Sequence, residues 1–263
     1  MKFLKTSLAA AAAVLSLAAQ AGPTVTTNTN ALALANAITG SGITIIGATL
    51  TTDTTAGNGT FTGGTSTVGF DAGVVLTTGA LSCVPGPNNS GSCSGAGASS
   101  ELSIDFTSTT GAVFFQYVFG SEEYNEFVGS IFNDTFALEL NGTNIALVPG
   151  GGGVVSINNV NCTTNSAYYR NNSAATGACA NSPNLSLDIQ YDGLTVILTA
   201  SGTTQAGLNN FKFRVTDVGD SSWDSGVFIK EGSFSGTGVP EPGSLALVGA
   251  ALAGLAIARR RKA

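Results

Sequence analysis

Histidine is absent from this chain of 263 residues. Without it there can be no Ser-His-Asp or Cys-His nucleophile system, because both use an imidazole as general base. Zinc and haem sites with imidazole ligands are excluded for the same reason. The sequence thus rules out several large classes of enzyme and metalloprotein before any motif is considered.

Basic residues are scarce between residues 22 and 238, where four lysines and arginines stand against 15 acidic residues. The net charge of that segment is therefore −11. Such a surface repels phosphate backbones, so nucleic acid is not expected as a partner. The same surplus of carboxylates favours divalent cations, above all calcium.

The N-terminus has the pattern of a secretory signal peptide. Lys2 and Lys5 precede an apolar run over residues 8–19, and the small-x-small sequence Ala19-Gln20-Ala21 follows. We expect export by the Sec machinery and cleavage after Ala21, which would remove residues 1–21.

The C-terminus, residues 239–263, combines a proline-rich motif, an apolar run and a basic tail. The run over 245–258 would form a helix of about 21 Å, shorter than the ~30 Å hydrocarbon core of a bilayer, so flanking residues have to contribute. We predict a transmembrane helix at 244–258 with its basic end inside the cell. The motif is Val239, Pro240, Glu241 and Pro242, and the basic flank is Arg259, Arg260, Arg261 and Lys262.

These three parts, in this order, resemble the PEP-CTERM sorting signal. The resemblance implies that the inner membrane holds the tail and that an exosortase recognises it near the Pro-Glu-Pro motif. It further implies sorting to the cell surface or extracellular matrix of a Gram-negative bacterium.

The body, residues 22–238, is rich in Gly, Thr, Ser and Asn and has the pattern of many short strands. It predicts an all-β fold, an antiparallel, jelly-roll-like β-sandwich with one short helix over 31–38, capped by Asn30 and stopped by Gly40. The dipeptides Asn141-Gly142 and Asp192-Gly193 predict two-residue hairpins. The predicted strands are 43–50, 74–76, 103–106, 113–119, 135–140, 143–148, 154–157, 185–191, 194–200, 210–218 and 226–234.

The four cysteines lie in loop-like stretches, and in an exported chain an even number predicts disulfides. Local pairing, Cys83 with Cys93 and Cys162 with Cys179, is the simplest of three possible connectivities. A four-cysteine zinc site is the alternative, although neither spacing is that of a C-x-x-C knuckle.

Two acidic segments are candidates for a calcium site, because calcium takes six to eight oxygen ligands in irregular geometry. The first, residues 119–127, directly follows an apolar run, and the second, residues 217–225, lies between two predicted strands. The candidate ligands are Glu122, Glu123, Glu126, Asp217, Asp220 and Asp224.

Two other interpretations of these segments stay open. The aspartates and serines can cap turns while the glutamates pair with Lys212 or Arg214. Alternatively, two acids among Glu122, Glu123, Asp217 and Asp224 can serve a glycosidase as acid and base. Tyr124 and Trp223 lie in the same segments and could stack on a sugar ring or form lids over the edge of the sandwich.

The chain also resembles the choice-of-anchor L domain over about residues 30–235. The matching segments are 69–79, 86–88, 114–127 with Tyr-Val-Phe-Gly-Ser-Glu-Glu-Tyr at 117–124, 133–136, 191–195 and 217–229. Asn125 stands where the family more often has proline, and Gly226 where alanine is commoner. The resemblance implies an extracellular, largely β module with no established reaction or ligand.

Together these features predict a non-enzymatic surface protein that acts in adhesion or in an exopolysaccharide or biofilm matrix. Exopolysaccharide is the expected ligand, and no cofactor is expected besides calcium. A carbohydrate-active hydrolase that uses an acidic pair is the alternative function.

Overall fold

The computed structural model describes residues 21–53, 57–88, 99–173, 177–220 and 222–238. The predicted transmembrane helix, the sorting motif and the basic tail lie outside these residues, as does the signal peptide except for Ala21. Among the described residues, no helix has the length and apolar character needed to cross a membrane.

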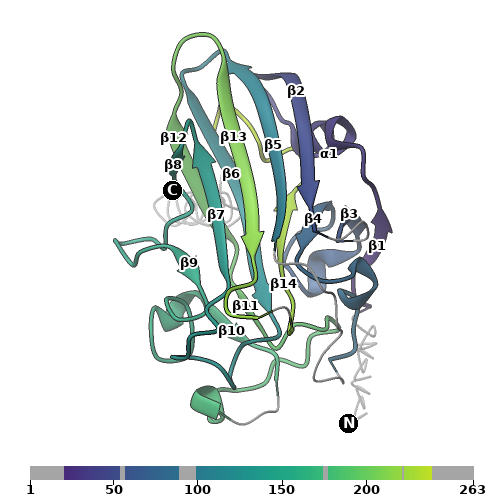
Figure 1. Cartoon of the computed structure of the whole chain (residues 1–263), viewed down its shortest axis with the longest axis vertical. Coiled ribbons are helices and arrows are strands. Elements are labelled where there is room, and N and C mark those ends of the chain that lie inside the picture. Colours follow the sequence, from purple (N-terminus) through teal and green to yellow (C-terminus); the bar gives the residue numbers. More distant parts are fainter. Residues whose placement is uncertain (1–20, 54–56, 89–98, 174–176, 221, 239–263) are drawn as a thin grey trace, which may run out of the picture.

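Two antiparallel sheets pack face to face, which confirms the predicted all-β sandwich (Figure 1). One has eight strands in the order β1-β3-β4-β14-β6-β11-β10, with β12 also paired to β6. Its strands are β1 (Thr24–Thr27), β3 (Asn58–Thr62), β4 (Gly73–Thr77), β6 (Ala112–Ser121), β10 (Tyr169–Asn171), β11 (Gly193–Thr195), β12 (Leu198–Thr203) and β14 (Ser225–Lys230).

The other sheet has six strands in the order β2-β5-β13-β7-β8, with β9 also paired to β7. Its strands are β2 (Ile43–Thr52), β5 (Ser99–Ser108), β7 (Thr135–Leu140), β8 (Thr143–Asn144), β9 (Val155–Ser156) and β13 (Asn209–Thr216). Four 3-10 turns, Gly64–Ser66, Leu81–Cys83, Ser166–Tyr168 and Gly177–Cys179, lie in the connections.

The main core lies between the sheets, where strands of the six-stranded sheet bury every second side chain. The eight-stranded sheet is covered on both faces, because a second cluster that includes Phe61, Val75 and Phe228 packs beneath its connecting segments. This explains why β4 and β14 are nearly continuous apolar runs rather than alternating ones.

The single described α-helix, α1 (Ala31–Ile38), has the predicted bounds and the predicted cap. The side-chain oxygen of Asn30 accepts a hydrogen bond from the Ala33 backbone N–H at 3.0 Å. Leu34, Ala35 and Ile38 are buried and hold the helix against the core beside β2 (Figure 1).

Of the two predicted hairpin turns, one is confirmed and one is wrong. Asn141 and Gly142 have φ of 50° and 82° and join β7 to β8. Residues 185–191 form no strand, and Gly193 instead begins β11. The reason is Asn172, whose amide donates to the backbone carbonyls of Leu187, Ile189 and Tyr191 at 3.0–3.3 Å and so replaces a strand partner.

Of the remaining strand predictions, that at 135–140 has the predicted bounds. Six others are confirmed with shifted ends: 43–50, 74–76, 103–106, 113–119, 210–218 and 226–234. The predicted strands at 143–148 and 154–157 are reduced to two residues each, and that at 194–200 is divided between β11 and β12. The strands β1, β3 and β10 were not predicted from the sequence.

Candidate functional site

The two acidic segments meet at one end of the sandwich, the lower end in Figure 1. The first follows β6 and the second joins β13 to β14. Since β14 pairs with β6 in one sheet and β13 pairs with β7 in the other, the ends of these strands bring both segments together. The backbone N–H of Glu122 donates to the carbonyl of Asp224 at 3.0 Å, which ties them directly. We call the carboxylates gathered here the acidic end.

The first group at the acidic end consists of Glu123, Asp217, Asp220 and Asp134, the residue just before β7. Glu123, Asp134 and Asp217 are 1%, 0% and 6% exposed, whereas Asp220 is exposed. Asp134 accepts hydrogen bonds from Val218 N–H at 2.8 Å and Ser225 Oγ at 2.6 Å. Both carboxylate oxygens of Asp217 and Oε2 of Glu123 are buried and have no hydrogen-bond partner among the described residues.

Burial and mutual repulsion raise the pKa values in this group. The pKa of Glu123 rises from an ordinary 4.5 to about 9, because of burial and then the charges of Asp134, Asp220 and Asp217. The pKa of Asp217 rises to about 8, through burial and then Asp134 and Asp220. The pKa of Asp134 rises only to about 6, because its two hydrogen bonds oppose the effect of burial. If these carboxyl groups were ionised at neutral pH, their buried negative charges would need a compensating cation.

Glu122 and Asp224 form a second group, joined by a hydrogen bond between their side chains. Such a bond between two carboxyl groups requires a proton on one of them. Burial and then the charge of Glu122 raise the pKa of Asp224 well above its usual range, and Thr77 Oγ1 donates to Asp224 Oδ2 at 3.1 Å. Gly79 makes the close packing possible, because a Cβ there would lie 2.5 Å from Cγ of Asp224.

Glu126 lies apart from both groups and faces Asp192. Burial raises the pKa of Asp192 to about 7, and the charges of Glu126 and Glu122 contribute, while the Asn88 amide donates to its Oδ1 at 2.6 Å and opposes the shift. The six predicted ligands therefore do not form one site. Asp134 and Asp192 were not among the site residues predicted from the sequence, although both lie in segments that carry the family resemblance.

The described basic side chains do not neutralise the acidic end. Lys212 and Arg214 form ion pairs with Glu101 on β5, so the predicted pairing with Glu122 or Glu123 is wrong. Arg170 donates to the Thr67 carbonyl at 2.7 Å, and Lys230 donates to the Gln116 side chain at 2.8 Å. Within the described residues, no group of three or more acids is preformed in a metal-binding arrangement.

The aromatic residues of the acidic segments have different environments. Tyr124 is 0% exposed and packs against Tyr169 at a centroid distance of 5.0 Å, so it is not available to stack on a ligand. Trp223 is half-buried and meets Phe127 edge to face at 5.2 Å, across the two segments. The Trp223 indole therefore joins the two acidic segments through its contact with Phe127.

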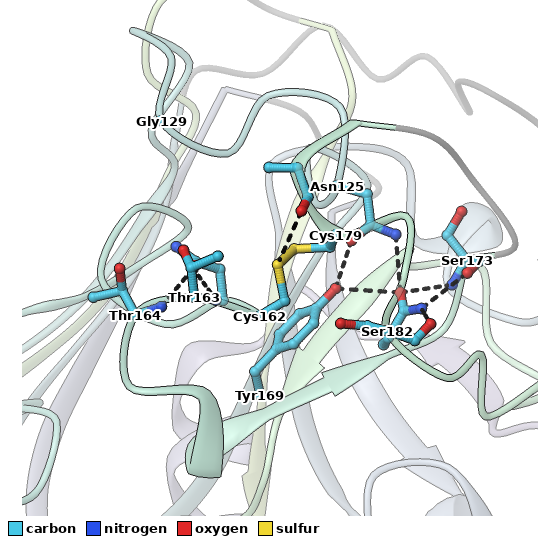
Figure 2. Close-up of a disulfide and its surroundings, with 12 residues drawn as sticks. Asn125, Gly129, Cys162, Thr163, Thr164, Tyr169, Ser173, Cys179 and Ser182 are labelled. Atoms are coloured by element: carbon cyan, nitrogen blue, oxygen red, sulfur yellow. Dashed lines mark hydrogen bonds between the residues drawn. A yellow bond between two sulfur atoms is a disulfide. The ribbon is translucent and has the colours of Figure 1, made fainter.

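A disulfide between Cys162 and Cys179, one of the two predicted, supports the first acidic segment (Figure 2). Cys83 is also disulfide-bonded, and its predicted partner Cys93 lies outside the described residues. Next to Cys179, the Ala178 N–H donates to the Asn125 carbonyl at 3.0 Å. The Asn125 side chain is held as well, since its amide donates to Asn171 at 2.9 Å and its oxygen accepts from the Tyr169 hydroxyl at 2.8 Å.

Removing this disulfide should destabilise the fold and loosen the acidic end. The bond closes a loop with a sequence separation of 17, which corresponds to about 3 kcal/mol in the chain-entropy account. We expect the double variant C162S/C179S to lower the free energy of unfolding by roughly that amount in urea titrations. Hydrogen exchange should also become faster at the amides of residues 122–127, and unchanged exchange there would contradict the supporting role.

Comparisons with known proteins identify two parts of the chain. The family model described as the choice-of-anchor L domain matches residues 23–235, and that of the PEP-CTERM protein-sorting motif matches residues 238–262. No curated protein and no solved structure matches the chain. The sorting motif marks an exported protein that exosortase directs to the cell surface through a membrane-anchored intermediate. The chain thus belongs to the choice-of-anchor L domain family and carries a PEP-CTERM sorting signal.

Proposed function

We propose that this chain is a non-catalytic module of the cell surface or exopolysaccharide matrix, and that calcium at its acidic end stabilises the adhesive form. One observation supports this most directly. Asp217 and Glu123 are buried together with three carboxylate oxygens that have no described hydrogen-bond partner. Buried charges of one sign require a counter-ion or a proton, and in an extracellular setting calcium can supply the charge.

Calcium suits this arrangement better than a smaller or softer ion. It accepts backbone carbonyls and water beside carboxylates, so two acids suffice as anchors when other oxygens complete its shell. Glu123 and Asp217 are the anchors we propose, with Asp220 at the solvent side. Binding would draw together carboxylates that otherwise repel one another.

Thermal unfolding of the fragment 22–238 in calcium or in EDTA tests this proposal. At a calcium concentration of about 100 times Kd, the expected stabilisation is about 2.7 kcal/mol, or roughly 5–10 °C in Tm. The variants E123Q and D217N should fold and lose this response. The matched controls E231Q and D71N alter exposed acids and should keep it.

A calcium effect absent from the wild type, or equally large in E123Q and D217N, would contradict the site. The adhesive role is tested separately, by sedimentation of the calcium-loaded fragment with exopolysaccharide from the producing cells. Retention without release of reducing sugar is expected. Release of reducing sugar that E123Q abolishes would instead establish the hydrolase.

A further inference from the structure

The backbone nitrogen of Gly22, at the start of the folded domain, is held by a carboxylate. The Gly22 N–H donates to Oδ2 of Asp188 at 2.7 Å, in a partly buried position. Asp188 lies far along the chain, in the irregular segment that Asn172 organises. The Asp188 carboxylate thus accepts a hydrogen bond from Gly22, the residue immediately after the predicted cleavage site Ala19-Gln20-Ala21.

Close packing fixes which residue occupies this place. A Cβ on residue 22 would lie 2.1 Å from the Asp188 carbonyl oxygen, so only glycine fits. The next residue, Pro23, is buried and is followed by β1, which pairs with β3 from Thr24 onward. The position of the Gly22 nitrogen is therefore set by the fold on one side and by Asp188 on the other.

We propose that Asp188 is the binding site for the α-ammonium group created when the signal peptide is cleaved after Ala21. Hydrolysis adds the hydroxyl of water to the Ala21 carbonyl carbon and a proton to the Gly22 nitrogen, and the Ala21–Gly22 bond breaks. At neutral pH the released amine takes up a further proton and becomes an ammonium. The neutral N–H···O bond becomes a charge-assisted ion pair, which is stronger.

Cleavage of the signal peptide thereby stabilises the domain. Before cleavage, Asp188 accepts one hydrogen bond from an amide. After cleavage it faces a full positive charge in a chain segment whose net charge is strongly negative. Cleavage one residue earlier or later would place the ammonium elsewhere. The ion pair with Asp188 therefore requires Gly22 to be the first residue of the mature protein.

Two measurements test the proposal. The first is the intact mass of the exported chain, which should correspond to a protein beginning at Gly22. The second is a cycle of four proteins of the 22–238 fragment: free Gly22 or Gly22 preceded by acetylated Ala21, each with Asp188 or D188N. We expect D188N to lower Tm by about 2–4 °C more when the ammonium is free. This extra loss should shrink in 1 M NaCl.

The control variant D71N, which alters an exposed acid, should have the same effect with either N-terminus. Reaction of the free α-amino group with an acylating reagent provides a second measurement, resolved from the lysines by peptide mapping. It should be several-fold faster in D188N than in the wild type. Equal Tm losses in both halves of the cycle, equal acylation rates, or a mature chain beginning at another residue would overturn the proposal.

Discussion

In EDTA, the fragment 22–238 should unfold at a temperature on the order of 10 °C lower at pH 9 than at pH 5. The reason is the acidic end, where the folded state holds protons that the unfolded chain releases. The pKa of Glu123 is about 9 and that of Asp217 about 8 in the fold, against ordinary values of 4.5 and 3.8.

The direction of the effect follows from proton linkage. Between these ordinary values and the raised ones, the native state binds more protons than the unfolded state, so the free energy of unfolding falls as the pH rises. Asp134 and Asp192, with pKa values of about 6 and 7, add to the lower part of this range. The stabilisation that these protonated groups contribute is therefore complete below about pH 4 and is lost progressively up to about pH 9.

Scanning calorimetry at pH steps from 5 to 9 measures the slope of Tm against pH. E123Q and D217N should each flatten it, because an amide neither titrates nor repels its neighbours. The controls E231Q and D71N should leave it unchanged. Under the calcium proposal, saturating calcium should also flatten it by stabilising the ionised carboxylates. A Tm that is constant or rises with pH in EDTA would show that these carboxyl groups do not have raised pKa values in the folded state.

The sequence correctly predicted those parts of the fold whose hydrogen bonds join residues close together in the chain. Helix α1 has its predicted bounds because Asn30 caps it within one turn, and the β7–β8 turn follows from Asn141 and Gly142. The strands β1 and β3 are made of Thr, Asn, Gly and single apolar residues, and they form because Thr24 pairs with Thr62 across the chain. Pairing at that separation leaves no periodic pattern in either segment.

The candidate site was predictable in its residue types but not in its grouping. The sequence places Glu122 and Glu123 side by side, yet the chain bends there, just after the end of β6, and the two side chains enter different groups. Asp134 joins Glu123 only because β7 lies beside β13 in one sheet while β6 lies beside β14 in the other. Sheet order of this kind depends on the whole topology and cannot be derived from a motif.

Truncation of one aromatic ring in the main core should have the largest effect on folding. Phe115, on β6, is fully buried and packs against Phe211 and Phe213 of the opposite sheet at centroid distances of 4.6 and 4.9 Å. It also stacks on Phe234 at 4.5 Å. We expect F115A to lower the free energy of unfolding by about 3–5 kcal/mol, through lost burial and the cavity that remains.

The adjacent residue provides a matched control, because Phe114 points to the other face of β6 and is only half-buried. F114A removes the same atoms and should cost about 1 kcal/mol, in keeping with a partly exposed side chain. Urea titrations of both variants measure the difference. Equal losses would mean that the two sheets are not held together through Phe115. A large loss in F115A alone would show that the aromatic contacts between β6 and β13 hold the sandwich together, and with it the strand ends that form the acidic end.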